Sequence, residues 1–500
     1  MLAPINIDFG SLNMITLAPM GIVLAGGLFI LMLDLVKSNL DKSMYVIFTL
    51  LTLFLALGSA VSIPTNAHGF FDMILNDGIA TLGQIIILGG SMLFLPLALT
   101  KKRFHEFSYP EFFAMFLFMI FGFQFMVSST NLIMIFVGLE TASLVLYTLI
   151  AMHNTKPSIE ASIKYFTMGA MAAGFFVMGS AVIYATTGSL DIIEIGKVLS
   201  ARIGEAGILI PIVGGSLLML VAIGFKVSLI PFHMWTPDAY EGATAPMAGY
   251  MSIIPKIAMM VVAIRLFDMY ISLDLTTIKW AIIALAVITT TVANMMALVQ
   301  KDVKRMLAYS SISHAGFIMV AVALGTTKAY SSIFIYYGLF LFTNLGAFTI
   351  LWISRAKKAR FHDRYNHPYE KFAGMIGIHP TAAVVMGIFM LSLAGVPPFS
   401  LFWGKLYVLS AIVDKGYYIV ALIMALNSAI AVYYYLKLIV YMFLKKPVEV
   451  DLGKDGTVYS NRAVALEVVV GISAFVTITS IFYIDPLMKF VTTLVKSAGF

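Results

Sequence analysis

Long apolar runs, separated by short polar gaps, make up most of this 500-residue sequence. Hydrophobic residues account for 60% of it and charged residues for 11%, and the mean hydropathy is +0.96. Soluble domains carry roughly half apolar and a quarter charged residues, so this chain falls outside that class. Because a helix needs about 20 mostly apolar residues to cross a bilayer, the sequence predicts an all-α, polytopic membrane protein of about fourteen transmembrane helices.

The polar residues that interrupt the apolar runs set the boundaries of these helices. We expect helices at residues 13–34, 43–63, 80–100, 108–127, 131–150, 160–185, 208–230, 247–268, 276–298, 302–324, 330–353, 375–413, 417–443 and 461–484. The span 375–413 is too long for one crossing unless its helix is broken or lies obliquely.

Helices four to eight and helices nine to thirteen of this set form two blocks of five spans each. Because five is odd, the second block would be inverted relative to the first. Pro231 interrupts the fourth helix of the first block, and Pro397 and Pro398 interrupt that of the second, which is typical of transport folds. The alternative is coincidence, since the blocks match weakly in sequence. We expect an N-terminal part at 1–107, inverted repeats at 108–268 and 269–443, and a last helix within 444–500.

Lysine and arginine are unevenly distributed among the loops between the predicted helices. The odd-numbered loops hold most of them, including Lys101, Lys102, Arg103, Lys304, Arg305, Arg355, Lys357, Lys358 and Arg360. Cytoplasmic loops of membrane proteins carry this excess. The pattern therefore predicts that the odd loops face the cytoplasm and that both termini lie on the opposite, periplasmic side.

Several ionisable residues lie inside the predicted spans. They are Glu140, Lys164, Lys226, Lys256, Lys405 and Lys437. A charge at the bilayer centre costs roughly 2.5–3.5 kcal/mol on insertion scales, so these side chains must face protein or water. Buried lysines and carboxylates can exchange protons, and we expect Glu140 to pair with Lys226 because pairing lowers the cost of burying each. For Lys164, which is closer to a charged loop, snorkelling to the interface is the main alternative.

In the second block, His314 and Lys405 extend this set from the membrane centre toward an exit. Histidine titrates near neutral pH, which suits a proton relay. A packing histidine bonded to the neighbouring serines is the alternative for His314. The five tyrosines at 336, 337 and 433–435 are interpreted as packing and interfacial residues without a chemical role.

The chain contains no cysteine, so disulfides, thiolate-ligated iron–sulfur clusters and CxxC motifs are excluded. We therefore predict neither a metal site nor a bound cofactor in this chain. The net charge of +7 does not indicate nucleic-acid binding, because the basic residues lie in loops where the orientation rule explains them.

One long motif and several short ones resemble the antiporter-like membrane subunits of NADH-quinone oxidoreductase, or respiratory complex I. The long motif runs from Lys226 to Gly242, Lys-Val-Ser-Leu-Ile-Pro-Phe-His-Met-Trp-Thr-Pro-Asp-Ala-Tyr-Glu-Gly, and Pro255-Lys256 follows it. The short ones are Gly138-Leu-Glu140, Glu160-Ala-Ser-Ile-Lys-Tyr165, Met306-Leu-Ala-Tyr-Ser-Ser-Ile-Ser-His314, Ser392-Leu-Ala-Gly-Val-Pro397 and Gly404-Lys405. The resemblance covers predicted helices four to thirteen, and it departs from the family pattern at Ala243-Thr-Ala-Pro246.

Within this family the chain is most similar to the N-type subunits. The M-like relatives carry glutamate where this chain has Lys405, and the L-like relatives continue into a long lateral helix that we do not expect here. The resemblance implies that Glu140, Lys226 and Lys256 form one half of a proton path, that Lys405 is the terminal site of the other half, and that Lys164 and His314 connect them.

The resemblance also implies a non-redox subunit of a proton-translocating enzyme in the bacterial inner membrane. Its partners would be the lipid bilayer and the other membrane and peripheral subunits, which would hold NADH, flavin, iron–sulfur clusters and quinone. Three alternatives remain open at this point: a subunit of an Mrp-type cation/proton antiporter, a purely structural membrane subunit, and a pumping subunit coupled to a hydrogenase or F420H2-type donor.

Overall fold

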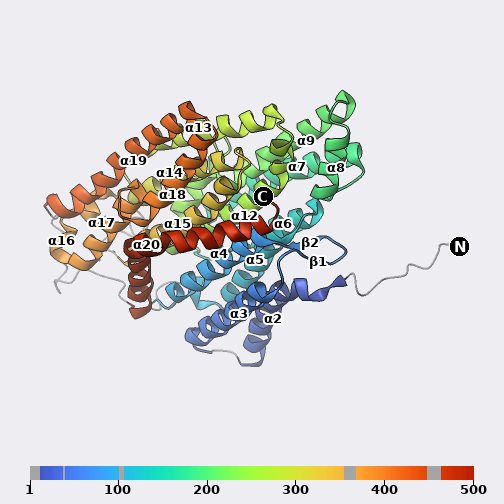
Figure 1. The fold of residues 1–500 in the computed structure, drawn as a ribbon. Helices are drawn as coiled ribbons and strands as arrows, with labels where there is room; N and C mark the ends of the chain where they lie inside the picture. The colour runs from blue at the N-terminus through green and yellow to red at the C-terminus, as the bar shows by residue number, and fades with distance from the viewer. Residues whose placement is uncertain (1–11, 38–39, 101–105, 354–366, 447–462) are drawn as a thin grey trace.

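The computed structural model describes residues 12–37, 40–100, 106–353, 367–446 and 463–500. Over these ranges the chain is a bundle of helices that run side by side, with one antiparallel hairpin of β1 (Ala67–Gly69) and β2 (Ile74–Asn76) (Figure 1). The basic residues at 101–103 and 355–360, on which part of the orientation argument depends, lie outside the described residues.

The helices follow the apolar runs of the sequence. In chain order they are η1 (Met14–Leu17), α2 (Ala18–Val36), α3 (Lys42–Ser62), α4 (Gly78–Phe94), η2 (Leu95–Ala98), η3 (Glu106–Ser108), α5 (Pro110–Ser128), α6 (Leu132–Ala151), α7 (Lys156–Thr187), α8 (Ile192–Ala201), α9 (Ala206–Val227), α10 (Trp235–Gly242), α11 (Ala245–Met251), α12 (Ile254–Ser272), α13 (Thr276–Leu298), α14 (Val303–Val322), α15 (Thr327–Ile353), η5 (Tyr369–Phe372), α16 (Met375–Ile378), α17 (Pro380–Ala394), α18 (Ser400–Asp414), α19 (Tyr418–Leu444) and α20 (Val464–Ser497).

Twelve spans in the described ranges are long and apolar enough to cross a membrane. The more polar helix α14 and the pair α17–α18, whose members are too short to count singly, complete the set of about fourteen crossings that the sequence predicts. The prediction of an all-α, polytopic membrane protein is confirmed.

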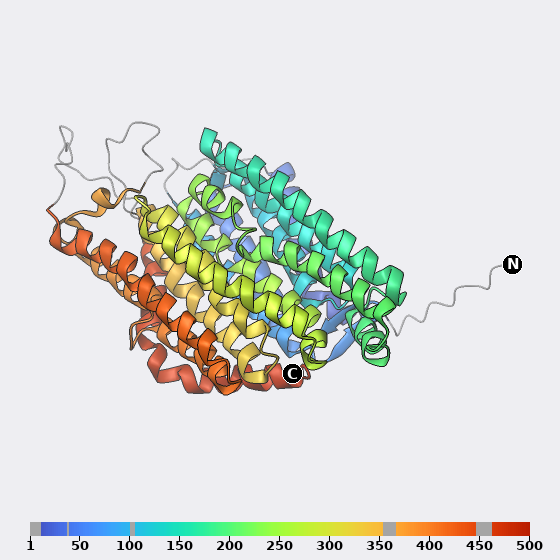
Figure 2. The ribbon, with the colours of Figure 1, turned by 90° about the horizontal axis from the view of Figure 1, so that it is seen from above.

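Helix α12 lies at the centre of the bundle. Together with α11 it forms a span that is buried over most of its length, and it packs against α4, α5, α9 and α14. Figures 1 and 2 show the helices α7 to α9 on one side of it and the helices α13 to α19 on the other. A residue on α12 can therefore contact both halves of the molecule.

Side-chain caps fix where several helices begin. The carboxylate of Asp302 accepts a hydrogen bond from the backbone N–H of Arg305 at the start of α14, and the amide oxygen of Asn131 caps α6 in the same way. Thr155 and Ser158 form a reciprocal capping box at the start of α7. Such caps satisfy backbone N–H groups that have no partner within the helix.

Three breaks interrupt the membrane-spanning helices. Pro231 lies between α9 and α10, and Pro397 and Pro398 lie between α17 and α18, so the long predicted span 375–413 is broken. The sequence analysis missed a third break, at residues 252–253, which divides the expected helix 247–268 into α11 and α12. The assignment of the two blocks as inverted repeats, with the domain boundaries given above, stays a prediction.

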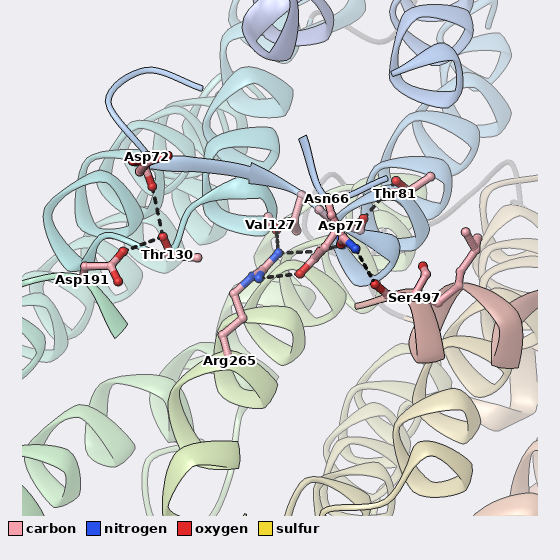
Figure 3. A network of polar contacts seen from close by, with 11 residues as sticks. Asn66, Asp72, Asp77, Thr81, Val127, Thr130, Asp191, Arg265 and Ser497 are labelled. Carbon is pink, nitrogen blue, oxygen red and sulfur yellow. Dashed lines mark hydrogen bonds and ion pairs between the residues drawn. The ribbon is translucent and has the colours of Figure 1, made fainter. Parts of the chain in front are cut away.

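The β-hairpin is bound to distant parts of the chain on one face of the bundle (Figure 3). Arg265 of α12 donates from both terminal nitrogens to the two carboxylate oxygens of Asp77, each at 2.8 Å, and one of them also donates to the carbonyl of Val127. The amide of Asn66 donates to the carbonyl of Ser497 at the end of α20. These contacts hold the hairpin, α4, α5, α12 and α20 together.

Candidate functional site

Lys226 lies on the last turn of α9, just before the first break, and its side chain is almost completely buried. Its ammonium donates to the hydroxyl of Ser143 at 2.6 Å and to the hydroxyl of Tyr147 at 3.3 Å, both on α6. It also lies 5.6 Å from the ring centre of Tyr147, 5.8 Å from that of Tyr165 and 5.6 Å from that of Phe225. Aromatic faces stabilise a cation by their quadrupole, so this site holds the ammonium without a carboxylate in contact.

Glu140 lies on the same face of α6 as Ser143 and Tyr147, three and seven residues before them. It interacts electrostatically with Lys226, but the lysine donates to Ser143 instead, and the carboxylate oxygen Oε1 of Glu140 is buried without a hydrogen-bond partner. The pairing expected between Glu140 and Lys226 is thus present as an electrostatic interaction, while the hydrogen bond of the lysine goes to a hydroxyl.

The break after Lys226 is stabilised from the following helix. The indole N–H of Trp235 donates to the carbonyl of Phe225 at 2.9 Å, and its ring stacks on Tyr165 with centres 4.0 Å apart. The hydroxyl of Thr236 donates to that of Ser228, which ends α9 in a left-handed conformation. Helix α10 is thus attached directly to the turn that carries Lys226.

Lys256 lies in the first turn of α12, directly after Pro255 and the third break. Its side chain is fully buried and donates to the carbonyl of Ser311 at 3.0 Å and to its hydroxyl at 2.8 Å. Ser311 belongs to α14. Lys256 therefore contacts the second half of the molecule from the central helix.

His314 lies on α14 three residues after Ser311 and is buried. Its Nδ1 lies 2.6 Å from the hydroxyl of Tyr336, and its Nε2 lies 3.0 Å from that of Tyr435. Tyr435 in turn lies 2.5 Å from the hydroxyl of Ser310. Both ring nitrogens are partnered by groups that can donate and accept, which is the arrangement a proton relay needs.

Lys405 lies on α18, after the break that contains Pro397 and Pro398, and is buried. Its ammonium donates to the carbonyls of Leu393 and Ala394, at 3.0 and 2.9 Å. These carbonyls end α17 and have no partner within the helix, so they and the helix dipole favour a cation. His314 is near enough to both Lys256 and Lys405 to interact with them electrostatically.

Lys164 lies apart from the buried lysines, with 45% of its side chain exposed on α7. It pairs with Glu160 at 2.8 Å and with Asp238 at 3.0 Å, so two carboxylates hold its charge. Lys437 donates to the carbonyl of Gln300 and lies over an aromatic ring.

The structure therefore brings Lys256, His314 and Lys405 together, with Lys226 and Glu140 in the adjoining half. The sequence reasoning missed Tyr336 and Tyr435, which it interpreted as packing, and the hydroxyls of Ser143, Tyr147 and Ser311. No group of three or more potential metal-binding side chains occurs among the described residues.

Known proteins resemble this chain in sequence and in fold. The family model described as NADH:quinone oxidoreductase/Mrp antiporter, transmembrane, matches residues 129–431. The NADH-quinone oxidoreductase subunit N of Sulfurovum sp. (strain NBC37-1) is 60% identical over 501 residues and covers all of both chains. A chain in the structure of respiratory complex I from Thermus thermophilus with bound aureothin is 27% identical, with a TM-score of 0.76 over 94% of this chain and 98% of that one.

A chain of the Mrp complex from Dietzia sp. DQ12-45-1b has a TM-score of 0.81, covering 97% of this chain and 98% of that one. Its sequence identity is 17%, so the likeness concerns the fold alone. The match with the subunit from Sulfurovum, by contrast, extends over the whole length at 60% identity.

Proposed function

Because the chain belongs to the NADH:quinone oxidoreductase/Mrp antiporter family of transmembrane proteins, we propose that it is the N subunit of a bacterial NADH-quinone oxidoreductase and carries protons across the membrane. The full-length match to subunit N at 60% identity supports this assignment over that of an Mrp antiporter subunit, since the compared Mrp chain is only 17% identical. NADH, flavin, iron–sulfur clusters and quinone would bind to its partner subunits, and this chain would have no redox step.

The observation that supports the proton path is the series of buried groups Lys226, Lys256, His314 and Lys405, each of which contacts a hydroxyl or a backbone carbonyl. In the first half, Glu140 and Lys226 would exchange a proton through Ser143 and Tyr147, which lie on one face of α6. Hydroxyl groups can donate and accept at once, so they pass a proton on without holding a charge.

In the second half, Lys256 would pass the proton through Ser311 toward His314, and Lys405 would be the terminal site. Lys256 contacts Ser311, and the hydroxyls of Tyr336 and Tyr435 contact both ring nitrogens of His314. The free carbonyls at the end of α17 would stabilise Lys405 while it is charged. Lys164, which is half exposed and paired with Glu160 and Asp238, would belong to the entry side of the path.

Quinone reduction in neighbouring subunits would drive the path by changing which of these groups hold protons. Lysines buried this completely are costly unless their partners compensate, so a change in one charge alters the stability of the next. The chain would thus couple an electron-transfer reaction elsewhere to proton movement through itself.

Proton pumping and electron transfer in membranes that carry Lys226→Ala or Lys405→Ala test this function. Both activities should fall by at least about tenfold while a native gel shows the assembled complex, because each substitution removes a proton-carrying group. Unchanged pumping in both assembled variants would favour a purely structural subunit. Proton movement by the unmodified complex that depends on sodium would favour a cation/proton antiporter.

A further inference from the structure

The long motif from Lys226 to Gly242 contains acidic residues that the proton path does not use. Asp238 and Glu241 lie on α10 and take part in a line of five alternating charges that joins α7, α10 and α14. We call this line the charge array: Glu160 to Lys164 at 2.8 Å, Lys164 to Asp238 at 3.0 Å, Asp238 to Arg305 at 3.3 Å and Arg305 to Glu241 at 2.5 Å.

Helix α10 is only two turns long, and other contacts fix both of its ends. At its start, Trp235 and Thr236 bond to the end of α9 beside Lys226. At its end, the buried ammonium of Lys304 donates to the carbonyl of Glu241 at 2.9 Å and to that of Ala243. Lys304 and Arg305 both belong to the first turn of α14.

Helix α14 carries two further residues of the path, Ser311 and His314. Helix α10 therefore connects the turn that carries Lys226 with α14, the helix whose Ser311 accepts hydrogen bonds from Lys256. A rotation or shift at either end changes the other, because the array and the Lys304 contacts leave α10 attached to both.

The charges of the array are one third to two thirds exposed. An isolated pair of this kind contributes little to stability, whereas several charges in a network with shared partners contribute more. Asp238 and Arg305 each contact two opposite charges, so neutralising either one breaks the line in the middle. We therefore expect the charge array to fix the relative position of the two halves more than it contributes to the free energy of folding.

We propose that Asp238, Glu241 and Arg305 are positioning residues that hold α10 between α9 and α14, so that a proton exchange at Lys226 alters the site of Lys256 and His314. This inference rests on the proposed function of the buried lysines. The three residues act through the helices they join and take no proton of the path themselves.

The test compares Asp238→Asn with Asp238→Glu in inverted membrane vesicles that contain the assembled complex. Asp238→Asn keeps the size of the side chain and removes its charge, so we expect proton pumping to fall roughly three- to tenfold. Asp238→Glu restores the carboxylate and should restore most of the rate. Arg305→Gln should behave like Asp238→Asn, and the double variant should be no worse than the poorer single one, since both break the same contact.

Glu205→Gln is the matched control, because it neutralises an exposed carboxylate that pairs with Arg202, outside the array. Pumping by Asp238→Asn at the level of this control would overturn the inference, as would independent, multiplying losses in the double variant. If Asp238→Asn does not assemble, Glu241→Gln against Glu241→Asp decides the question by the same comparison.

Lys226→Ala measured in the same vesicles separates this inference from the proposed function. If Lys226→Ala lowers pumping and Asp238→Asn does not, only the positioning role fails. If Lys226→Ala pumps normally, the path itself fails, and the array then has nothing to position.

Discussion

At the scale of single residues, the chemistry of Lys226 can be separated from its charge. Lys226→Arg keeps a cation among the aromatic rings and can still donate to Ser143, but a guanidinium does not release its proton at working pH. We therefore expect the complex to assemble and its proton pumping to fall by at least about tenfold. Dye-based pumping assays beside native gels measure both quantities.

Lys437→Arg is the control for this change, because Lys437 also lies over an aromatic ring, that of Tyr369, and donates to a carbonyl. We expect it to pump normally. Normal pumping by Lys226→Arg as well would mean that a fixed positive charge is all the site requires.

The sequence predicted the lysines of the site but not their partners, and the reason is physical. A lysine in an apolar span is costly, so Lys226, Lys256 and Lys405 stand out from composition alone. Tyr336 and Tyr435 stand beside other tyrosines in their spans and carry no charge, so they do not stand out, and only the fold brings their hydroxyls to His314. The sequence indicated the electrostatic pairing of Glu140 with Lys226 but not the hydrogen bond from Lys226 to Ser143, because a serine in a span carries no charge that would single it out.

At the scale of elements, the turn that ends α17 positions Lys405. Gly395 has φ +85°, and a Cβ atom there would lie 2.8 Å from Cδ of Lys405. Gly395→Ala should therefore both strain the left-handed turn and push the lysine away from the carbonyls of Leu393 and Ala394. We expect a pumping loss of roughly tenfold in an assembled complex, because the cation loses its two acceptors.

Gly416→Ala provides the matched control for that turn. Gly416 has φ +78°, and a Cβ atom there would meet nothing within 4 Å. The backbone strain is therefore similar, but no site residue moves. Equal effects of the two substitutions on pumping would show that the strained turn, not the displacement of Lys405, is responsible.

The buried ion pair beside the β-hairpin leads to a prediction about stability. Arg265 and Asp77 are 5% and 3% exposed, so Arg265→Ala leaves a buried carboxylate without its cation (Figure 3). Removing one partner of a buried pair costs about 3–5 kcal/mol, and we expect a large drop in the assembled complex after mild heating in detergent. The exposed pair of Arg202 with Glu205 serves for comparison, and Arg202→Ala should have little effect. Equal heat sensitivity of the two variants would contradict the structural role of the buried pair.

At the scale of the whole molecule, hydropathy predicted the bundle because each span must satisfy its backbone inside one helix. Hydropathy predicted the ends of helices poorly where polar residues occur within a helix. The expected helix 461–484 continues to Ser497 in α20, past Asp485 and Pro486, because the end of α20 packs against Gly78 beside the hairpin. Contacts of this kind join residues far apart in sequence, and no periodicity indicates them.

The orientation of the bundle is the remaining prediction at this scale, and the absence of cysteine from the chain makes it directly testable. Ser200, on α8, lies in an even-numbered loop, and Lys301, just before α14, lies in an odd-numbered one; both are exposed. If the positive-inside rule holds, a membrane-impermeant maleimide should label Ser200→Cys in intact spheroplasts and Lys301→Cys only in inverted vesicles. Labelling of both in detergent establishes that each thiol is accessible. The opposite pattern would place both termini in the cytoplasm and would reverse the direction in which Lys405 leads out of the membrane.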